Sequence, residues 1–297
     1  MFSRRHPILF SILVFSAIAG ATVVALAITL SVAFRGDDLS FSDAQKVGII
    51  EIEGVILDAQ TVLEDLKRFR EEDSVRAIVL RIDSPGGVVG PAQEIYREVL
   101  KTRDEKTVIA SMGSIAASGG YYVAAAADGV MANPGTITGS IGVIIEYTNF
   151  RSLLDKIGLV PVVIKSGEYK DLASPVKPMS EEERKILQTF ADQTHTQFIR
   201  AVAEGRGMDD SAVARLADGR IFNGEQAREL GLVDRLGNLQ DAVDWAAALA
   251  GIEGDVKTVY SRTEKYSLLG LLTEGAARLL SRQFKASDLF AGYLYKP

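Results

Sequence analysis

The stretch Gly113-Ser-Ile-Ala-Ala-Ser-Gly-Gly-Tyr121 decides the fold around it, because a strand pattern ends and a helix pattern begins close to Ser118. The apolar run 107–111 before it predicts a buried strand, and the alanine-rich run 122–127 after it predicts a helix. Free backbone N–H groups at such a turn favour a nearby anion. The two glycines after Ser118 carry no Cβ, so another chain can approach the hydroxyl closely. The turn therefore suits a nucleophile whose reaction develops an oxyanion.

A capping serine in a tight turn is the competing interpretation of Ser118. Serine is a preferred residue at helix N-termini, and on this stretch alone we favour the cap. The choice between a cap and a nucleophile depends on the rest of the chain.

The composition excludes several classes of function. The 297 residues are 47% hydrophobic and 24% charged, which predicts a packed globule. A net charge of −6 without a basic block makes nucleic acid an unexpected partner. The absence of cysteine excludes thiol catalysis, thiolate metal sites and disulfides. The chain has two histidines, His6 and His195, and no HExxH pattern, so we expect neither a metal nor a cofactor.

The N-terminal region has the pattern of a membrane anchor. Residues 7–34 contain no charge and exceed the roughly 20 residues that span a bilayer. Arg4 and Arg5 precede this run, which predicts a cytoplasmic head and an exported remainder. A cleaved signal peptide is the alternative, supported by Ser31-Val32-Ala33, but its apolar region would exceed the 7–15 residues that are typical. We expect an uncleaved single-pass anchor.

The residues after the anchor alternate between strand and helix patterns. This alternation predicts an α/β domain with a largely parallel sheet, whose ligands gather beyond the carboxyl ends of the strands. Two glycine-rich turns follow expected strands, Asp83-Ser-Pro-Gly-Gly87 and the turn at Ser118. We expect Asp83 itself to form an Asx turn or a cap. The expected strands are 46–54, 75–83, 108–111 and 160–165, and the expected helices are 59–70, 91–102, 150–157, 211–217, 224–230 and 239–250. A further long helix should run from a capping box at Ser180–Glu183 to about residue 204.

A nucleophilic serine needs a base to accept its proton. His195 lies deep in the long helix without an evident orienting carboxylate, and such a histidine is more often a packed side chain. His6 would lie on the wrong side of the membrane. A lysine is the remaining option, and burial can keep it neutral. Composition alone does not choose among the lysines.

Four motifs together identify a family. Residues 83–87 (DSPGG), 117–121 (ASGGY), 138–142 (TGSIG) and 167–170 (GEYK) occur in this order. Their sequences and spacing closely resemble the short, single-repeat signal peptide peptidase A family, the membrane-anchored serine proteases of peptidase family S49. The resemblance covers about residues 46–250. It implies a ClpP/crotonase-like fold with repeated β-β-α units, preceded by one transmembrane helix.

The resemblance also implies the roles of individual residues. Ser118 matches the nucleophile, Lys170 the general base, and Ser140 the serine that orients the lysine. The oxyanion hole pairs the N–H of Gly119 with one from the upstream glycine turn. We prefer Gly87 for that second donor, and Gly86 is the alternative.

The activity implied by the family is peptide hydrolysis through an acyl-enzyme, on signal-peptide remnants and other apolar peptides. The family further implies a homo-oligomeric ring, expected to be an octamer, whose sites are completed by neighbouring subunits. The catalytic domain would lie on the periplasmic or extracellular side of the inner (plasma) membrane. An acyl-CoA-processing enzyme of the same superfold and a catalytically silent membrane scaffold are the alternatives. The anchor and the lack of a basic cluster for CoA oppose the first, and the intact candidate site opposes the second.

These inferences divide the chain into four segments. They are a head and anchor at 1–36, a linker at 37–45, a protease domain at 46–255 and a tail at 256–297. The tail has three possible uses: its leucine-rich part, 266–280, could pack on protein or lie on the membrane, or its end, 289–297, could enter a peptide-binding groove as a pseudo-substrate.

Overall fold

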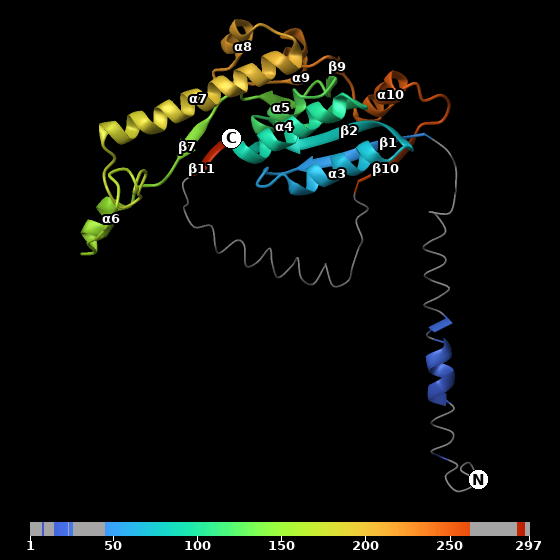
Figure 1. The fold of residues 1–297 in the computed structure, drawn as a ribbon, viewed down its shortest axis with the longest axis horizontal. Helices are drawn as coiled ribbons and strands as arrows, with labels where there is room; N and C mark the ends of the chain where they lie inside the picture. The colour runs from blue at the N-terminus through green and yellow to red at the C-terminus, as the bar shows by residue number, and fades with distance from the viewer. Residues whose placement is uncertain (1–7, 9–14, 23, 26–44, 262–289, 295–297) are drawn as a thin grey trace. The chain divides into compact units, whose positions relative to one another are not determined.

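The structure is a computed structural model that describes residue 8 and residues 15–22, 24–25, 45–261 and 290–294. It divides into two units, Met1–Ala44 and Gln45–Pro297, and the second contains all of the candidate site residues (Figure 1). None of the helices in the described ranges is long and apolar enough to span a bilayer. Most of the expected anchor lies outside those ranges, as does the leucine-rich part of the tail.

A mixed but largely parallel sheet of eight strands forms the centre of the second unit. Its main path runs β10-β1-β2-β4-β5-β9, with β6 paired to β4 and β8 paired to β6. All of these pairs are parallel except β6–β8. The strands are β1 (Lys46–Glu53), β2 (Val75–Ser84), β4 (Thr107–Ala117), β5 (Gly129–Ala132), β6 (Ile137–Gly139), β8 (Ile221–Phe222), β9 (Arg235–Leu236) and β10 (Lys257–Tyr260). The expected α/β class is confirmed.

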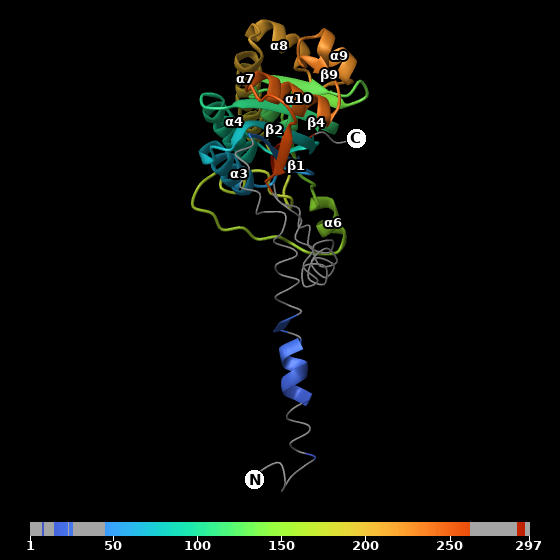
Figure 2. The ribbon, with the colours of Figure 1, turned by 90° about the vertical axis from the view of Figure 1, so that its right-hand side faces the viewer.

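Helices cover both faces of this sheet, which explains the nearly continuous apolar runs of its central strands. Alternate side chains of β2 point to opposite faces, so Ile78 and Leu80 join one core cluster while Ala77 and Val79 join the other. The first cluster is closed by α3 (Gln60–Glu71), α4 (Val89–Arg103), α5 (Gly119–Ala124) and α7 (Glu181–Arg206), and the second by α10 (Leu239–Leu249). Figure 2 shows α7 grouped with α8 (Asp210–Leu216) and α9 (Gly224–Glu229) at one end of the unit.

The long helix begins where the sequence predicts. The Ser180 hydroxyl accepts a hydrogen bond from the Glu183 N–H (3.1 Å), and the Glu183 carboxylate accepts one from the Ser180 N–H (3.0 Å). Together these bonds form the expected capping box. At the other end, α7 stops at Gly207, whose φ of 61° suits glycine.

Two of the expected strands differ from the structure. The strand predicted to end at Ser111 continues as β4 to Ala117, because its later residues pair with β2 and β6. Residues 160–165, predicted to be a strand, have no regular structure, and Ile164 is 97% exposed. Strand propensity measures how well a residue packs on a sheet, and no described strand pairs with this segment.

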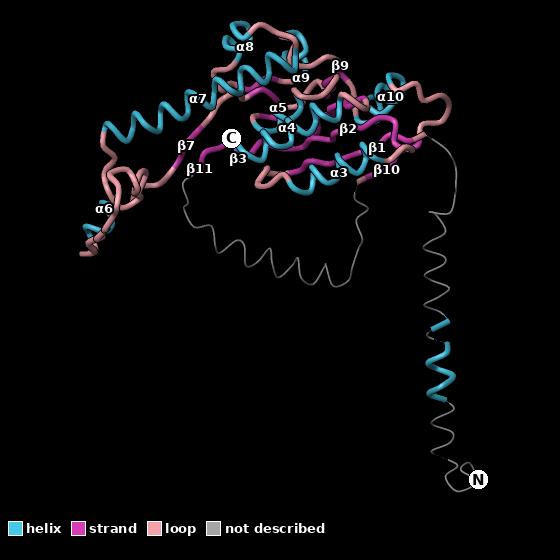
Figure 3. The backbone as a smooth tube through the Cα atoms, in the orientation of Figure 1, coloured by secondary structure: helices cyan, strands magenta, loops and turns pink. Residues whose placement is uncertain are grey.

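A second, three-stranded sheet lies beside the glycine turn, in the order β3-β11-β7. Its strands are β3 (Gly86–Val88), β11 (Phe290–Leu294) and β7 (Ile144–Glu146), which are labelled in Figure 3. Both pairings are antiparallel. Residues close to the end of the sequence therefore lie between two segments of the central domain. The expected helix near residue 150 is present as α6 (Arg151–Lys156), between β7 and α7.

Close packing of α7 against α5 makes Gly205 a sensitive position. A Cβ at Gly205 would lie 2.0 Å from the Ala125 carbonyl oxygen, so one backbone must shift. We expect Gly205→Ala to lower the free energy of unfolding by about 2 kcal/mol, the usual cost of overpacking. Gly90→Ala in α4 is the matched control, because a Cβ there meets nothing within 4 Å and gains up to about 1 kcal/mol of helix propensity. Urea unfolding of both variants in detergent measures the difference, and equal stabilities would contradict this packing.

Candidate active site

Ser118 occupies the junction of β4 and α5, as the sequence predicts. Its backbone N–H donates to the Gly139 carbonyl oxygen (2.8 Å), and its own carbonyl oxygen accepts from the Tyr122 N–H (2.8 Å). The side chain makes no capping hydrogen bond. Ser118 therefore occupies the N-cap position of α5, but its side chain does not cap the helix. The residue is buried, with 1% of its surface exposed.

The backbone at Ser118 is in a conformation that L-residues rarely adopt, with φ of 52° and ψ of −117°. Over the part of the chain that the structure describes, the other non-glycine residues with positive φ are Ser140 and Ala173. Such conformations cost on the order of 1–3 kcal/mol each and cluster at functional sites. Both candidate serines thus carry backbone strain.

The pairing of β4 with β6 places Ser140 beside Ser118. The last pair in their parallel register is Ala117 with Gly139, so each serine is the residue that directly follows the end of its strand. Neighbouring strands lie about 4.8 Å apart. Ser140 is buried, and its N–H donates to the Arg220 carbonyl oxygen (2.8 Å). The structure therefore brings together two serines that only the family resemblance had linked.

The upstream glycine turn lies against the same junction. A Cβ at Gly120, the second residue of α5, would lie 2.7 Å from the Ser84 carbonyl oxygen, so the turn and α5 are in close contact. Gly86 has φ of 99°, and its N–H donates to the Ser84 hydroxyl (3.1 Å). Gly87 lies so close to Ile56 that a Cβ would be 2.0 Å from its carbonyl oxygen. The Gly86 N–H therefore already has a partner inside the turn, while Gly87 is paired with Tyr293 of β11.

Asp83 has a structural role, but not the one expected. Its carboxylate accepts hydrogen bonds from the backbone N–H groups of Ser114 (3.3 Å) and Ile115 (3.2 Å) on β4. The β2–β4 register shifts between Ile82 and Ser84, and Asp83 compensates for that irregularity. The expectation of an Asx turn or a cap was wrong, because sequence alone did not reveal the bulge.

Lys170 lies on a separate part of the chain, which we call the arm and define as residues 147–180. Figure 1 shows the arm, with α6, extending away from the sheet. The Lys170 side chain is exposed, and its backbone N–H donates to the Gly167 carbonyl oxygen (3.2 Å). Within the described parts of this single chain, no hydrogen bond joins Lys170 to Ser118 or Ser140.

An ion-pair network holds the loop that carries Lys170. The Asp171 carboxylate accepts from the Nζ atoms of Lys165 (2.6 Å) and Lys177 (2.8 Å), and Lys177 also pairs with Glu183 at the start of α7 (2.5 Å). Hydrogen bonds from the two lysines lower the pKa of Asp171 to about 2. The two lysines nearest to Lys170 in this loop are therefore engaged, whereas Lys170 forms no ion pair with any described residue.

The arm also exposes a large apolar surface. Its helix α6 buries no residue. More than half of each of seven apolar side chains is exposed: Leu153, Ile157, Leu159, Val160, Val162, Val163 and Ile164. Contiguous apolar surface of this kind marks a protein or membrane contact.

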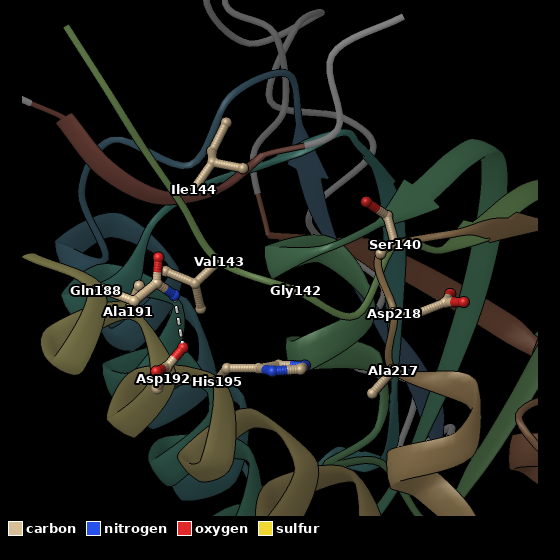
Figure 4. A pocket seen from close by; sticks show the side chains of 11 residues that line it. Ser140, Gly142, Val143, Ile144, Gln188, Ala191, Asp192, His195, Ala217 and Asp218 are labelled. Atoms are coloured by element: carbon tan, nitrogen blue, oxygen red, sulfur yellow. Dashed lines mark hydrogen bonds between the residues drawn. The ribbon is translucent and has the colours of Figure 1, made fainter. Parts of the chain in front are cut away.

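His195, the histidine considered as a base, lines a pocket of about 490 Å³ that also includes Ser140 (Figure 4). Its Nε2 atom is buried and has no hydrogen-bond partner. Figure 4 shows the imidazole extending across the pocket while the Ser140 hydroxyl points away from it. The geometry thus does not support His195 as a base, and no sequence signal had pointed to the pocket. No group of three or more metal-ligating side chains occurs among the residues described.

The strain at Ser118 can be measured by comparing glycine with alanine. Glycine adopts positive φ without a Cβ clash, so Ser118→Gly should be more stable than Ser118→Ala by about 1 kcal/mol. Ser114, an exposed β4 residue with ordinary φ, is the control, where glycine should be the less stable of the two by about 0.5–1 kcal/mol. Urea unfolding of the four variants tests the difference. If glycine and alanine are equally stable at position 118, the backbone there is unstrained.

Comparison with known proteins agrees with this arrangement. Residues 101–253 match peptidase family S49, and residues 39–137 match the Clp protease family. A Synechocystis relative named as a protease is 45% identical over 240 residues, which are 80% of this chain and 86% of the relative. An Enterococcus faecium relative named for signal peptide peptidase SppA is 40% identical over 214 residues, which are 67% of this chain and 62% of the relative. Protease 4 of Haemophilus influenzae is 33% identical over 221 residues, which are 71% of this chain but only 36% of that protein.

The matches cover the strands and turns that carry the candidate site, from the glycine turn through Ser118 to α10. The fold, the junction at Ser118 and these relatives lead to one conclusion. The chain belongs to peptidase family S49 and is a serine peptidase of the signal peptide peptidase A type.

Proposed function

We propose that this chain is a membrane-anchored serine endopeptidase that cleaves extended apolar peptides, among them signal-peptide remnants, with a Ser118–Lys170 dyad. One observation carries the proposal. A strand, β11, already lies antiparallel between β3, which holds the oxyanion glycines, and β7, which follows Ser140. An extended peptide can bind in the same place through backbone hydrogen bonds, which is the β-augmentation mode of recognition.

The place that β11 occupies between β3 and β7, which we call the groove, has a direction. The register pairs Phe290 with Glu146 at one end of β11 and Leu294 with Gly86 at the other. A peptide that runs the same way therefore approaches the glycine turn with its later residues. The bond that follows them would lie at the oxyanion donors and Ser118.

The chemistry follows from these positions. The Ser118 hydroxyl attacks the peptide carbonyl carbon as its proton passes to the neutral lysine amine, which Ser140 orients. The N–H groups of Gly119 and Gly87 stabilise the oxyanion, and loss of one such donor typically costs about 10²–10³ in rate. The lysine returns the proton to the leaving amine, and the acyl-enzyme forms as the C–N bond breaks. Water, deprotonated by the same lysine, then hydrolyses the ester.

The lysine comes from a neighbouring subunit in this proposal. Lys170 belongs to the arm, which extends away from the sheet in Figure 1 and exposes apolar side chains that need a partner surface. A head-to-tail contact repeated around an axis closes into a ring, and an octamer is the ring that we propose. Each arm would then deliver its lysine to the Ser118 of the next subunit.

The membrane location rests on the N-terminal sequence. The uncharged run 7–34 serves as a single-pass anchor in the inner (plasma) membrane, with Arg4 and Arg5 on the cytoplasmic side. The protease domain then lies outside the cytoplasm, where cleaved signal peptides remain in the membrane. The Enterococcus faecium relative, named for a signal peptide peptidase, supports this class of substrate.

Mixing two inactive variants tests the dyad and its sharing between subunits. Ser118→Ala and Lys170→Ala should each abolish peptidase activity, because nucleophile and base act as a unit. Rings reassembled from equal amounts of both should regain about a quarter of wild-type activity, since that fraction of head-to-tail contacts joins an intact serine to an intact lysine. Activity is followed with a fluorogenic peptide, and active serines are counted with a fluorophosphonate probe. Lys101→Ala, an exposed lysine of α4, is the control and should remain active. If the mixed rings assemble but stay inactive, the dyad is not shared between subunits.

The position of β11 predicts that this strand competes with substrate. Gly292 pairs with both Val88 and Ile144, so a proline there removes a backbone donor and disrupts the strand. We expect Gly292→Pro to lower KM for a short peptide several-fold while kcat changes little. Gly135→Pro is the control, because Gly135 lies in an open turn where nothing lies within 4 Å of an added Cβ. Gly254→Pro would not serve, because the φ of Gly254 is 86° and proline fixes φ at about −65°. An unchanged KM in Gly292→Pro would show that β11 does not compete with peptides.

A further inference from the structure

The pocket beside Ser140 is part of the peptide groove. It is lined by the residues that lead from Ser140 into β7, among them Gly142 and Ile144. Ile144 is also the residue that pairs with Gly292 of β11. A strand in the groove therefore runs along the rim of the pocket, close to the nucleophile. Since Gly292 has no side chain, β11 itself places none into the pocket at that position.

The opposite wall of the pocket is polar. It consists of one face of α7, with Gln188, Asp192 and His195, and of the loop that ends α8, with Asp218. No lysine or arginine lines the pocket, although Arg220 pairs with Asp218 just outside it. Asp192 accepts a hydrogen bond from the Gln188 amide (2.7 Å) and forms no ion pair with the described residues. The local charge is consequently negative.

His195 supplies an atom that lacks a partner. Its Nε2 is the one buried side-chain nitrogen or oxygen without a hydrogen bond in the described parts of the chain. A buried polar atom without a partner costs free energy, so a ligand that pairs with it gains more than one that does not. Figure 4 shows the imidazole reaching from α7 across the pocket toward Ala217, within the space that a side chain would enter.

We infer that this pocket is a side-chain subsite of the peptidase, and that His195 and Asp192 make it select a long basic residue, lysine or arginine, shortly before the scissile bond. The inference rests on the proposed function and adds one polar requirement to an otherwise apolar substrate. The 490 Å³ volume accommodates an unbranched side chain whose stem passes Val143 and Ile144. Its terminal N–H groups then donate to Nε2 and to the Asp192 carboxylate. An acidic side chain of the same length meets the Asp192 carboxylate, which no described cation neutralises, and is rejected.

The test compares lysine with norleucine, which has the same unbranched stem without the ammonium group. Fluorogenic peptides carry one or the other at each of the four positions before the cleaved bond. For the full-length wild-type chain in detergent, we expect kcat/KM to favour lysine about tenfold at a single position, as a charged hydrogen bond allows. The same peptides are titrated against Ser118→Ala by fluorescence anisotropy. This binding assay needs no turnover, so it tests the pocket even if the proposed function is wrong.

Substitutions in the pocket identify which of its residues cause the preference for lysine. His195→Leu removes Nε2 at similar size and should abolish the preference for lysine, whereas His195→Gln should retain part of it. Asp192→Asn should reduce the preference by lowering kcat/KM for lysine peptides more than for norleucine peptides. Gln193→Leu, on the same helix but outside this pocket, should preserve the wild-type ratio.

Three results would overturn the inference. The first is a wild-type enzyme that favours lysine at none of the four positions. The second is a His195→Leu ring that keeps the wild-type ratio in both cleavage and binding. The third is a His195→Gln or Asp192→Asn variant whose ring dissociates while its ratio of kcat/KM for lysine over norleucine peptides stays unchanged. That result would show that the pocket is a contact between subunits. By contrast, wild-type protein that cleaves neither peptide, yet binds the lysine peptide more tightly, would refute the proposed function alone.

Discussion

The hydrogen bond from the Ser118 N–H to the Gly139 carbonyl oxygen (2.8 Å) is the contact on which the candidate site depends. It closes the β4–β6 register, and that register makes Ser118 and Ser140 neighbours although 21 intervening residues separate them in sequence. Both serines then leave their strands with positive φ, which turns the chain into α5 on one side and toward β7 on the other. Ser118, the strand β7 and the pocket wall at Ser140 thus share one backbone constraint.

The second sheet is the feature that favours an extended peptide as the ligand of this site in the function that we propose. Strand β3 has three residues and β7 has three, and neither belongs to the eight-stranded sheet, so each presents backbone groups that need a partner. A single strand between them satisfies both sides at once. Recognition of this kind depends on backbone shape and leaves selectivity to pockets along the rim. In the function that we propose, only a few side chains of the peptide would then have to fit.

Local patterns predicted most of the fold, and long-range contacts account for what they missed. The capping box at Ser180, the nearly continuous apolar run of β2 and the glycine turns are all encoded within a few residues, and each is present. The extension of β4 to Ala117, the role of Asp83 and the position of β11 depend on partners far along the chain. Residues 160–165 have the composition of a strand but lack such a partner. Ser118 could be proposed from its turn, whereas Ser140 and Lys170 required the family resemblance. The pocket at His195 could not be proposed, since three separate segments form it.

The arm connects assembly to chemistry. A monomer leaves Val162 and Ile164 almost fully in water, and burial of apolar area at about 25 cal/mol per Å² favours association. The same segment holds its loop in place through Asp171, which binds two lysines, while Lys170 forms no ion pair with the residues that the structure describes. In the ring that we propose, burial of the arm against a neighbour would also remove water from Lys170 and so favour its neutral form, which is the form a base requires. Association would then supply both the missing residue and the environment that activates it, and an unassembled chain in the membrane would remain inactive toward other proteins.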